Sequence, residues 1–412
     1  MDRAAIMGGA EERIRQHRTA EATLRLVDKA GKPLPRATVE VRLARHEFKL
    51  GANAYRINAI EDTVLQRDYY DAFAALLNYA TLPFYWGGYE PQPGNPQQPR
   101  LHQMATWCRE HGITTKGHPL VWHEVFPKWA AAMPDPEVLA LQERRVREIV
   151  AGFKGQIDIW DVVNEATVSQ RFPNAVGRWI KANGAAKCVA EALRWAHEAN
   201  PDAILLYNDF NVSPDFERLV QALLDARAPV HTIGIQSHMH KGTWPIERLW
   251  RVCDAYARFR LPLHFTEATV LSGELKKDDD WHRRREDWHT TPDGEKAQLE
   301  YGQLFYTVLF SHPAVEAITW WDFSDHGAWQ GAPAGLVRRD MTPKPLYGWL
   351  LEAFHKRWAT HARLVTDASG AATLRCFFGE HAVRATTLSG QVLRGSFGLL
   401  KAAERRLTVT LD

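Results

Sequence analysis

The sequence predicts an α/β fold: a (β/α)8 TIM barrel with a small β-sandwich built from the N-terminal and C-terminal strands. Two observations predict the barrel. Strand patterns alternate with helix patterns from residue 47 to residue 358, and this stretch of about 310 residues has the size of such a barrel. A third observation predicts the sandwich, because short alternating β patterns are confined to residues 1–46 and 359–412. We therefore expect three segments, of which the outer two combine into the sandwich.

Apolar runs of strand length in the middle segment are separated by longer helical patterns. We expect strands at residues 48–54, 78–85, 114–121, 157–163, 204–208, 232–236, 263–266 and 317–321. We expect helices at residues 64–77, 101–111, 137–152, 185–199, 214–226, 246–259, 296–310 and 347–357. Catalytic side chains of such barrels lie where the strands end, on the C-terminal face.

The two end segments carry shorter patterns. Residues 10–19 favour a short polar helix, and residues 22–27 and 38–43 alternate between apolar and polar side chains. Two strands alone are marginally stable in water, so they need partners. Residues 372–378, 381–387 and 406–411 offer such partners, which favours one joint sandwich. The alternative is two unrelated β extensions.

The composition is that of a globular protein, with 45% hydrophobic and 24% charged residues. Lys and Arg number 51 against 49 Asp and Glu, and this balance gives no support for a nucleic-acid or membrane partner. The 16 Trp residues suit a carbohydrate partner, because flat apolar ring faces stack on sugars. The sequence leaves the oligomeric state open.

The cysteines and the N-terminal region bear on the compartment. The 4 cysteines are widely spaced and form no CxxC pair, which is typical of reduced thiols. Residues 1–24 contain no apolar signal-peptide core, and no uncharged apolar stretch of about 18 residues occurs elsewhere. We expect a soluble, cytoplasmic protein, or a secreted one if a signal peptide was removed.

Glutamates follow two of the predicted strands. The run 157–163 is followed by Asn164 and Glu165, and the run ending at Thr266 is followed by Glu267. Taken alone, Glu165 would be an acid in a surface loop, because burial disfavours its charge. The second glutamate changes this interpretation, since both strands end at the same face of the barrel. The pair predicts a carboxylate-based enzyme, as glycosidic bond cleavage requires.

Further motifs surround these glutamates. Residues 116–123 read Lys-Gly-His-Pro-Leu-Val-Trp-His, residues 160–166 read Trp-Asp-Val-Val-Asn-Glu-Ala, and residues 234–238 read Gly-Ile-Gln-Ser-His. Trp321 ends the eighth predicted strand, and Asp325 and Trp329 follow it. Together with residues 208–211, these motifs resemble glycoside hydrolase family 10, whose best-known members are endo-β-1,4-xylanases. The resemblance covers residues 48–357.

The resemblance implies roles for individual residues. Glu165 would be the general acid/base and Glu267 the nucleophile of a retaining enzyme, and Asn164 would bind the sugar 2-hydroxyl. The other residues expected to bind substrate are Tyr85, Trp86, His118, Trp122, His123, Gln236, His238, Trp321 and Trp329. No cofactor or metal is implied; the alternative of a metal pair at His238 and His240 lacks a Cys or carboxylate at ligand spacing.

Two departures from the family pattern concern sugar selection. Relatives carry an Asn, Glu and Lys cluster before a Trp after strand two, whereas residues 81–86 here read Thr-Leu-Pro-Phe-Tyr-Trp. Relatives also carry an Asp where Thr269 stands, and that Asp orients the supporting His. Directly after Glu267, residues 269–295 form a long insertion that contains Trp281 and Trp288. We expect it to be a lid or cleft wall, although its charge run alone is typical of a solvated face.

The sequence therefore predicts a retaining β-glycoside hydrolase that uses two glutamates in a double displacement. Its expected substrates are xylo-oligosaccharides or related short or aryl β-glycosides. One alternative is an ordinary endo-β-1,4-xylanase acting on xylan. An alternative of another class is a catalytically weak carbohydrate-binding protein, although a binder has no need for a general acid.

Overall fold

The computed structural model describes all 412 residues, and its internal contacts divide the chain into two units. One unit contains Leu50–Gly302 and Ala314–Lys344, and the other contains Met1–Lys49, Gln303–Pro313 and Pro345–Asp412. None of the helices combines the length and the apolar character that a membrane span requires.

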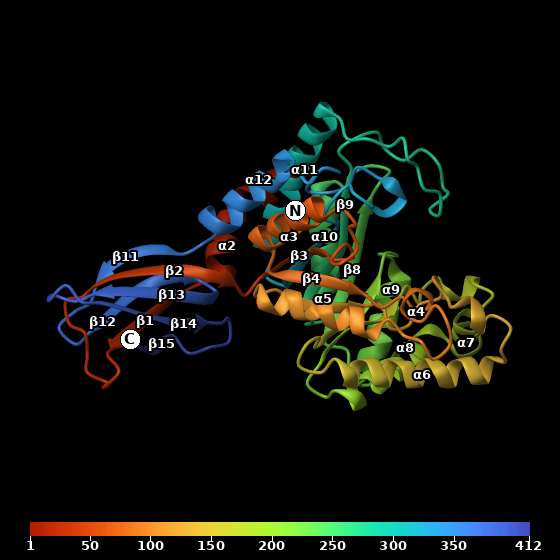
Figure 1. Cartoon of the computed structure of the whole chain (residues 1–412), viewed down its shortest axis with the longest axis horizontal. Coiled ribbons are helices and arrows are strands. Elements are labelled where there is room, and N and C mark those ends of the chain that lie inside the picture. The colour runs from red at the N-terminus through yellow and green to blue at the C-terminus, as the bar shows by residue number, and fades with distance from the viewer. The chain divides into compact units, whose positions relative to one another are not determined.

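A closed barrel of eight parallel strands forms the larger part (Figure 1). Its strands are β3 (Lys49–Asn53), β4 (Tyr79–Pro83), β5 (Thr114–His118), β6 (Ile159–Asn164), β7 (Ile204–Asp209), β8 (Thr232–Met239), β9 (Leu263–Val270) and β10 (Val315–Asp322). They close in the order β10-β3-β4-β5-β6-β7-β8-β9, so the predicted (β/α)8 fold is confirmed. Every residue of β6 is buried, as expected for parallel strands that are covered on both faces.

The barrel interior is a packed core. Tyr79, Ile159, Leu206 and Ala317 form one hydrophobic cluster although they come from strands that are mostly not neighbours. Only the inside of the barrel brings such strands together, so these side chains fill its centre. Apolar side chains therefore fill the barrel at this level, and the polar side chains of the interior lie nearer the C-terminal ends of the strands.

Helices separate the strands, and α5 and α8 contact the strands beside them (Figure 1). The helices are α3 (Thr63–Leu76), α4 (Trp86–Tyr89), α5 (Gln98–Glu110), α6 (Asp135–Gly152), α7 (Ala175–Asn183), α8 (Ala185–Ala199), α9 (Pro214–Asp225), α10 (Ile246–Ala257), α11 (Pro292–Ser311) and α12 (Pro345–Glu352). The sequence analysis did not predict α4 or α7. Helix α7 has clear local signals, because Asn174 caps its N-terminus and Gly184, at φ 84°, follows its end.

The terminal segments form two β-sheets over a shared core. One sheet has the order β12-β1-β15 and the other β11-β2-β13-β14. The strands are β1 (Thr19–Val27), β2 (Thr38–His46), β11 (His361–Val365), β12 (Ala371–Phe377), β13 (Gly379–Thr386), β14 (Val392–Leu399) and β15 (Arg406–Thr410); two short helices, α1 (Arg3–Gly8) and α2 (Ala10–Arg18), precede them. Side chains from both sheets, among them Leu24 and Val41, join one hydrophobic cluster. The predicted sandwich of N- and C-terminal strands is confirmed, while the boundaries 46/47 and 358/359 stay a prediction.

The shared core yields a stability prediction. Leu24 is fully buried between the sheets, so Leu24→Ala should lower the free energy of unfolding by about 2–5 kcal/mol. Leu388→Ala removes the same atoms from a side chain that is 76% exposed and should change it by less than about 0.5 kcal/mol. Urea denaturation followed by fluorescence measures both. Equal effects of the two substitutions would contradict a common core of the two sheets.

Candidate active site

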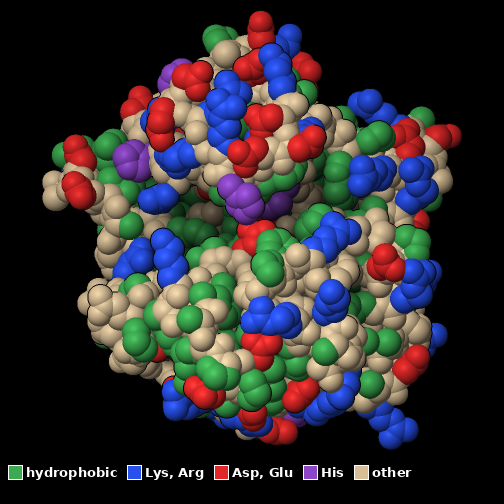
Figure 2. Space-filling view, turned by 90° about the vertical axis from the view of Figure 1, so that its right-hand side faces the viewer, with side chains coloured by type: hydrophobic (Ala, Val, Ile, Leu, Met, Phe, Trp, Pro, Cys, Tyr) green, Lys and Arg blue, Asp and Glu red, His purple; other side chains and the backbone are tan.

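The C-terminal ends of the barrel strands carry the predicted site residues. The elements that follow these strands, among them α4 and α7, lie on the right of Figure 1. Figure 2 looks onto that side and shows a hollow in the surface, with hydrophobic side chains inside it and His, Lys and Arg side chains at its edge.

Glu165 lies just beyond the end of β6, in a left-handed backbone conformation with φ 59°. Trp122 Nε1 donates to its Oε2 at 3.0 Å, while Gln236 Nε2 and Asn164 Nδ2 donate to its Oε1 at 2.9 and 3.1 Å. Burial raises the pKa of Glu165 to about 8, and the nearby charge of Glu267 adds to this although the bonds from Gln236 and Trp122 oppose it. Glu165 is therefore mostly protonated at neutral pH.

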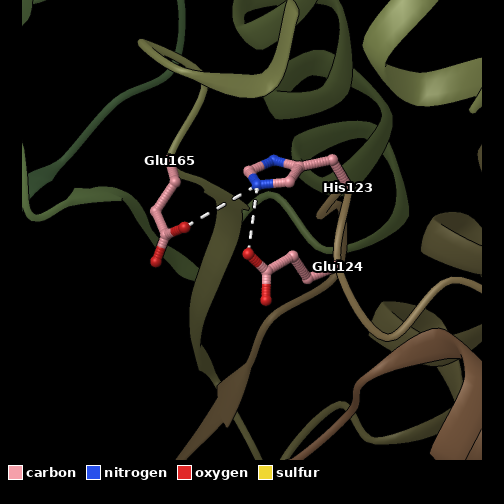
Figure 3. A group of neighbouring side chains, drawn as sticks. All are labelled: His123, Glu124 and Glu165. Carbon is pink, nitrogen blue, oxygen red and sulfur yellow. Dashed lines mark ion pairs between the residues drawn. The ribbon is translucent and has the colours of Figure 1, made fainter. Parts of the chain in front are cut away.

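His123 lies against the carboxyl group of Glu165 (Figure 3). Ser169 Oγ donates to the Glu165 carbonyl, so His123 must donate from Nδ1 to Ser169 Oγ, at 2.6 Å. The other ring nitrogen, Nε2, then carries a lone pair and has no hydrogen-bond partner. This atom lies 3.8 Å from Glu165 Oε2. Burial lowers the pKa of His123 to about 3, and the ring is therefore neutral. A lone pair beside Oε2 favours a proton on that oxygen.

The same group could be considered as a cation site. Ligand atoms of His123, Glu124 and Glu165 lie within 4.8 Å of one another (Figure 3). Both oxygens of Glu165 already accept hydrogen bonds from N–H donors, which a cation would have to displace or share. The arrangement suits a carboxyl group that holds a proton better than one that holds a metal.

Glu267 lies on β9 and is almost fully buried. Asn208 Nδ2 donates to its Oε1 at 2.8 Å, and His238 Nε2 lies 3.0 Å from its Oε2. Thr269 Oγ1 lies 2.9 Å from His238 Nδ1, so a hydroxyl donor there leaves Nε2 free to donate to Glu267. Burial raises the pKa of Glu267, while the charges of His118 and Lys116 and the bond from Asn208 oppose this rise. Thr269 thus holds the tautomer of His238 without adding a negative charge.

Asn208 connects the two glutamates. Its Nδ2 group donates both to Glu267 Oε1 and to Asn164 Oδ1, each at 2.8 Å, and Asn164 in turn donates to Glu165. Thr266 Oγ1 donates to Asn208 Oδ1 at 2.5 Å, which fixes the orientation of the amide. The sequence analysis placed Asn208 in a motif but gave it no role. The sequence signal that could have identified Asn208 is its place at the end of an apolar strand, which it shares with Asn164.

A buried ionic network lies under Glu267. Asp161 Oδ2 accepts from Lys116 Nζ at 2.5 Å and from His118 Nδ1 at 2.7 Å. Burial alone would raise the pKa of Asp161, but Lys116 and His118 hold it below its ordinary value. His118 Nε2 lies 3.7 Å from Glu267 Oε1. Lys116 and Asp161 therefore fix the position of a histidine that faces the second glutamate.

Aromatic side chains border the site on the β10, β3 and β4 side. The Tyr85 ring packs against His118 at 5.5 Å and against Trp122 at 5.4 Å between ring centroids. Trp321, at the end of β10, packs edge-on against His118 at 5.4 Å and against Tyr55 at 5.7 Å. The sequence analysis predicted all of these as substrate-binding residues except Tyr55. Tyr55 follows β3 and belongs to none of the family motifs, so only its position in the fold shows that it borders the site.

Trp329 and the insertion form another part of the border. Trp329 is 37% exposed and packs against His238 at 4.9 Å between centroids. Trp281, from the insertion of residues 269–295, stacks on Trp329 at 5.9 Å with an interplanar angle of 19°. The fully buried His240 packs edge-on against both indole rings. The insertion thus contributes to the wall beside Trp329.

Trp86 lies in a different environment from the other predicted residues. Its ring packs against Phe126 and Trp129, and its Nε1 donates to Glu90 Oε2 at 3.0 Å. These neighbours belong to a separate hydrophobic cluster at the start of α4. A direct contact between Trp86 and substrate stays a prediction.

The buried network under Glu267 yields a prediction. Lys116→Met keeps the volume but leaves the Asp161 carboxylate buried without its ammonium partner. We expect the free energy of unfolding to fall by about 3–5 kcal/mol, measured by chemical denaturation. Lys154→Met, which alters an exposed pair with Asp202, is the matched control and should leave stability nearly unchanged. A loss no greater than that of the control would show that Lys116 does not stabilise Asp161.

Known proteins share both the sequence and the fold of this chain. Residues 58–353 match the family described as Glycosyl hydrolase family 10. A Beta-1,4-xylanase of Dictyoglomus thermophilum is 29% identical over 255 residues, which cover 59% of this chain and 70% of that protein. The Anti-sigma-I factor RsgI6 of Acetivibrio thermocellus is 27% identical over 388 residues. That match covers 92% of this chain, which spans 46% of the length of the anti-sigma factor.

Solved structures agree with these matches. The native xylanase 10B from Thermotoga maritima is 26% identical, covers 76% of this chain and 97% of its own, and has a TM-score of 0.62. Xylanase 10B from Thermotoga petrophila RKU-1, solved in complex with xylobiose, is 25% identical with the same TM-score of 0.62. It covers 75% of this chain and 95% of its own. The chain therefore belongs to glycosyl hydrolase family 10.

Proposed function

We propose that this protein is a retaining β-glycoside hydrolase in which Glu165 is the general acid/base and Glu267 the nucleophile. The observation that carries the proposal is a pair of buried carboxyl groups in different environments on one face of the barrel. Glu165 lies beside the unprotonated Nε2 of His123, which favours a carboxylic acid. Glu267 accepts from Asn208 and faces His238, with the Lys116 ammonium nearby, which favours a carboxylate.

The reaction follows from these two states. In the first step the glycosidic oxygen takes the proton of Glu165 as its bond to the anomeric carbon breaks, while a Glu267 oxygen bonds to that carbon. In the second step Glu165, now a carboxylate, removes a proton from water, whose oxygen displaces Glu267 from the same carbon. Two displacements on opposite faces restore the original configuration.

The electrostatic coupling between the two groups supports this change of role. The negative charge of Glu267 raises the pKa of Glu165. Forming the glycosyl ester removes that charge, and the pKa of Glu165 should then fall. Glu165 is thus an acid when the leaving group needs a proton and a base when water must lose one.

Xylo-oligosaccharides or related short or aryl β-glycosides are the proposed substrates. The relatives that are named xylanases support a xylose-type sugar. Tyr85, from the stretch that stands where relatives carry an Asn, Glu and Lys cluster, packs beside His118 and Trp122, and this argues for a substrate different from theirs. The ordinary endo-β-1,4-xylanase on xylan is the second candidate, since a similar structure was solved with xylobiose.

A weak carbohydrate-binding protein is the candidate from another class. It is favoured by one observation: the match that covers 92% of this chain is to a protein named as an anti-sigma factor. Turnover of any β-glycoside that depends on Glu267 separates this candidate from the enzyme.

The decisive experiment uses aryl β-glycosides of xylose, glucose and galactose with substitutions of the two glutamates. Glu267→Ala should abolish turnover, because it removes the oxygen that bonds to the anomeric carbon in the first step. Glu165→Ala should lower kcat/KM about 10²–10⁴-fold for poor leaving groups and much less for activated ones. Glu110→Ala alters an exposed glutamate at the end of α5 and serves as the control. Undiminished turnover by the Glu267 variant, or an inverted first product in proton NMR, would refute the mechanism.

The pH dependence of kcat/KM should be bell-shaped. Glu165 must be protonated, so activity should fall as pH rises through about 8, its pKa in the free enzyme. Glu267 must be ionised, and its raised pKa should place the acid limb above the ordinary range of a glutamate. Glu165→Gln should lose the alkaline limb when tested on an activated aryl glycoside that needs no acid. An alkaline limb that survives this substitution would assign that proton to another group.

A further inference from the structure

We infer that the glycone pocket holds a single sugar, so that the enzyme releases one residue from the non-reducing end or cleaves a simple monosaccharide β-glycoside. The inference rests on the proposed function and specifies its substrate class. It depends on three features: the side on which the glycone lies, the wall that bounds this side, and the contacts that fix the wall.

The order of strands decides where the glycone points. Glu165, at the end of β6, protonates the leaving group, so the leaving group lies on the β6 side. In the closed order β10-β3-β4-β5-β6-β7-β8-β9, strand β10 is opposite β6. The far end of the sugar attacked by Glu267 therefore points toward β10, β3 and β4. A second glycone residue would need an opening on that side.

A continuous aromatic wall lies there instead. The hydroxyl groups of Tyr55 and Tyr85 are hydrogen-bonded at 3.2 Å, and their rings meet edge-on at 6.0 Å between centroids. Tyr55 then contacts Trp321 at 5.7 Å. Tyr85 and Tyr55 follow β4 and β3, and Trp321 lies at the end of β10. These strands are consecutive in the barrel, so the three side chains form an unbroken series of contacts along this side. We call Tyr55, Tyr85 and Trp321 the glycone wall.

Further contacts fix the glycone wall in place. Arg100, from α5, donates to the backbone carbonyl of Tyr55 at 3.3 Å. Arg56, the next residue, donates to the carbonyl of Gly327 and so ties the segment after β3 to the segment after β10. The packing is close, because a Cβ atom on Gly327 would lie 2.3 Å from the Arg56 guanidinium carbon. These bonds hold the glycone wall in a fixed position and argue against a flap that opens to admit a longer oligosaccharide.

The wall also offers the chemistry that a terminal sugar needs. Burial raises the pKa of both phenol groups well above the usual value, so the hydroxyls are neutral. Each hydroxyl can still accept a hydrogen bond after bonding to the other, and the end of a terminal sugar presents free hydroxyls to them. A chain that continued here would present a glycosidic oxygen and a further ring instead.

Matched pairs of 4-nitrophenyl β-glycosides test the inference on the unmodified protein. Each pair shares a leaving group and differs in the glycone: xyloside against xylobioside, and glucoside against cellobioside. We expect kcat/KM to favour the monosaccharide of the preferred pair by at least about 10-fold. Xylotetraose or cellotetraose labelled at the reducing end should lose single residues from its unlabelled end. A preference for the disaccharide, or cleavage of internal bonds, would overturn the inference and leave the proposed function standing.

Substitutions locate the preference in the glycone wall. Tyr55→Ala removes the centre of the wall and should reduce the preference for the monosaccharide at least several-fold. Tyr70→Ala removes an equal volume outside the wall, where Tyr70 stacks on Trp107, and should keep the preference. Tyr85→Phe keeps the blocking ring and should keep it as well. If the protein hydrolyses none of the four glycosides, both the proposed function and this inference are contradicted.

Discussion

The site depends on one constraint: two carboxyl groups are buried close together, and each must be supplied with hydrogen-bond donors in place of water. The ends of the parallel strands supply them: Asn164 on β6 is paired with Asn208 on β7, and β8 places Gln236 and His238 beside the end of β9, which carries Glu267. His118, which faces Glu267, is in turn hydrogen-bonded to Asp161, and Asp161 also accepts from Lys116. A barrel whose centre is filled with apolar side chains could not hold these groups without such pairing.

Much of the fold could be predicted because its signals are local. Apolar runs of strand length, each followed by a helical pattern, identify β3 to β10 directly in the sequence. Strand β14 was missed because Gly395 and Gly398 interrupt its alternation, and β11 because it is short and half-exposed. Helix α4 was missed because it spans four residues that contain two glycines, Gly87 and Gly88. These elements owe their structure to neighbouring strands and loops more than to their own residues.

The site shows the same division between local and spatial information. Glu165 and Glu267 stand out in the sequence because an acid at the end of an apolar run is unusual. The bridging position of Asn208 arises from the pairing of β7 with β6 and β8, which the sequence does not display. Tyr55 and Tyr85 are 30 residues apart and meet only because β3 and β4 are adjacent in the barrel. Their contact changes the interpretation of the strand-two departure, which in the sequence is only a loss of polar groups.

The lone pair on His123 Nε2 has a consequence for what the site can bind. This nitrogen, the Glu267 carboxylate and the two tyrosine oxygens can all accept hydrogen bonds, while both N–H bonds of Asn208 are already engaged. The unoccupied valences at the site are thus mainly acceptors. Ligands that bring hydroxyl protons match this pattern, whereas sugars whose hydroxyls are replaced by fluorine or methoxy groups can only accept. The acceptor atoms of such analogues would face acceptor atoms of the site and could form no hydrogen bonds with them. The site would therefore bind these analogues weakly even where their shape fits.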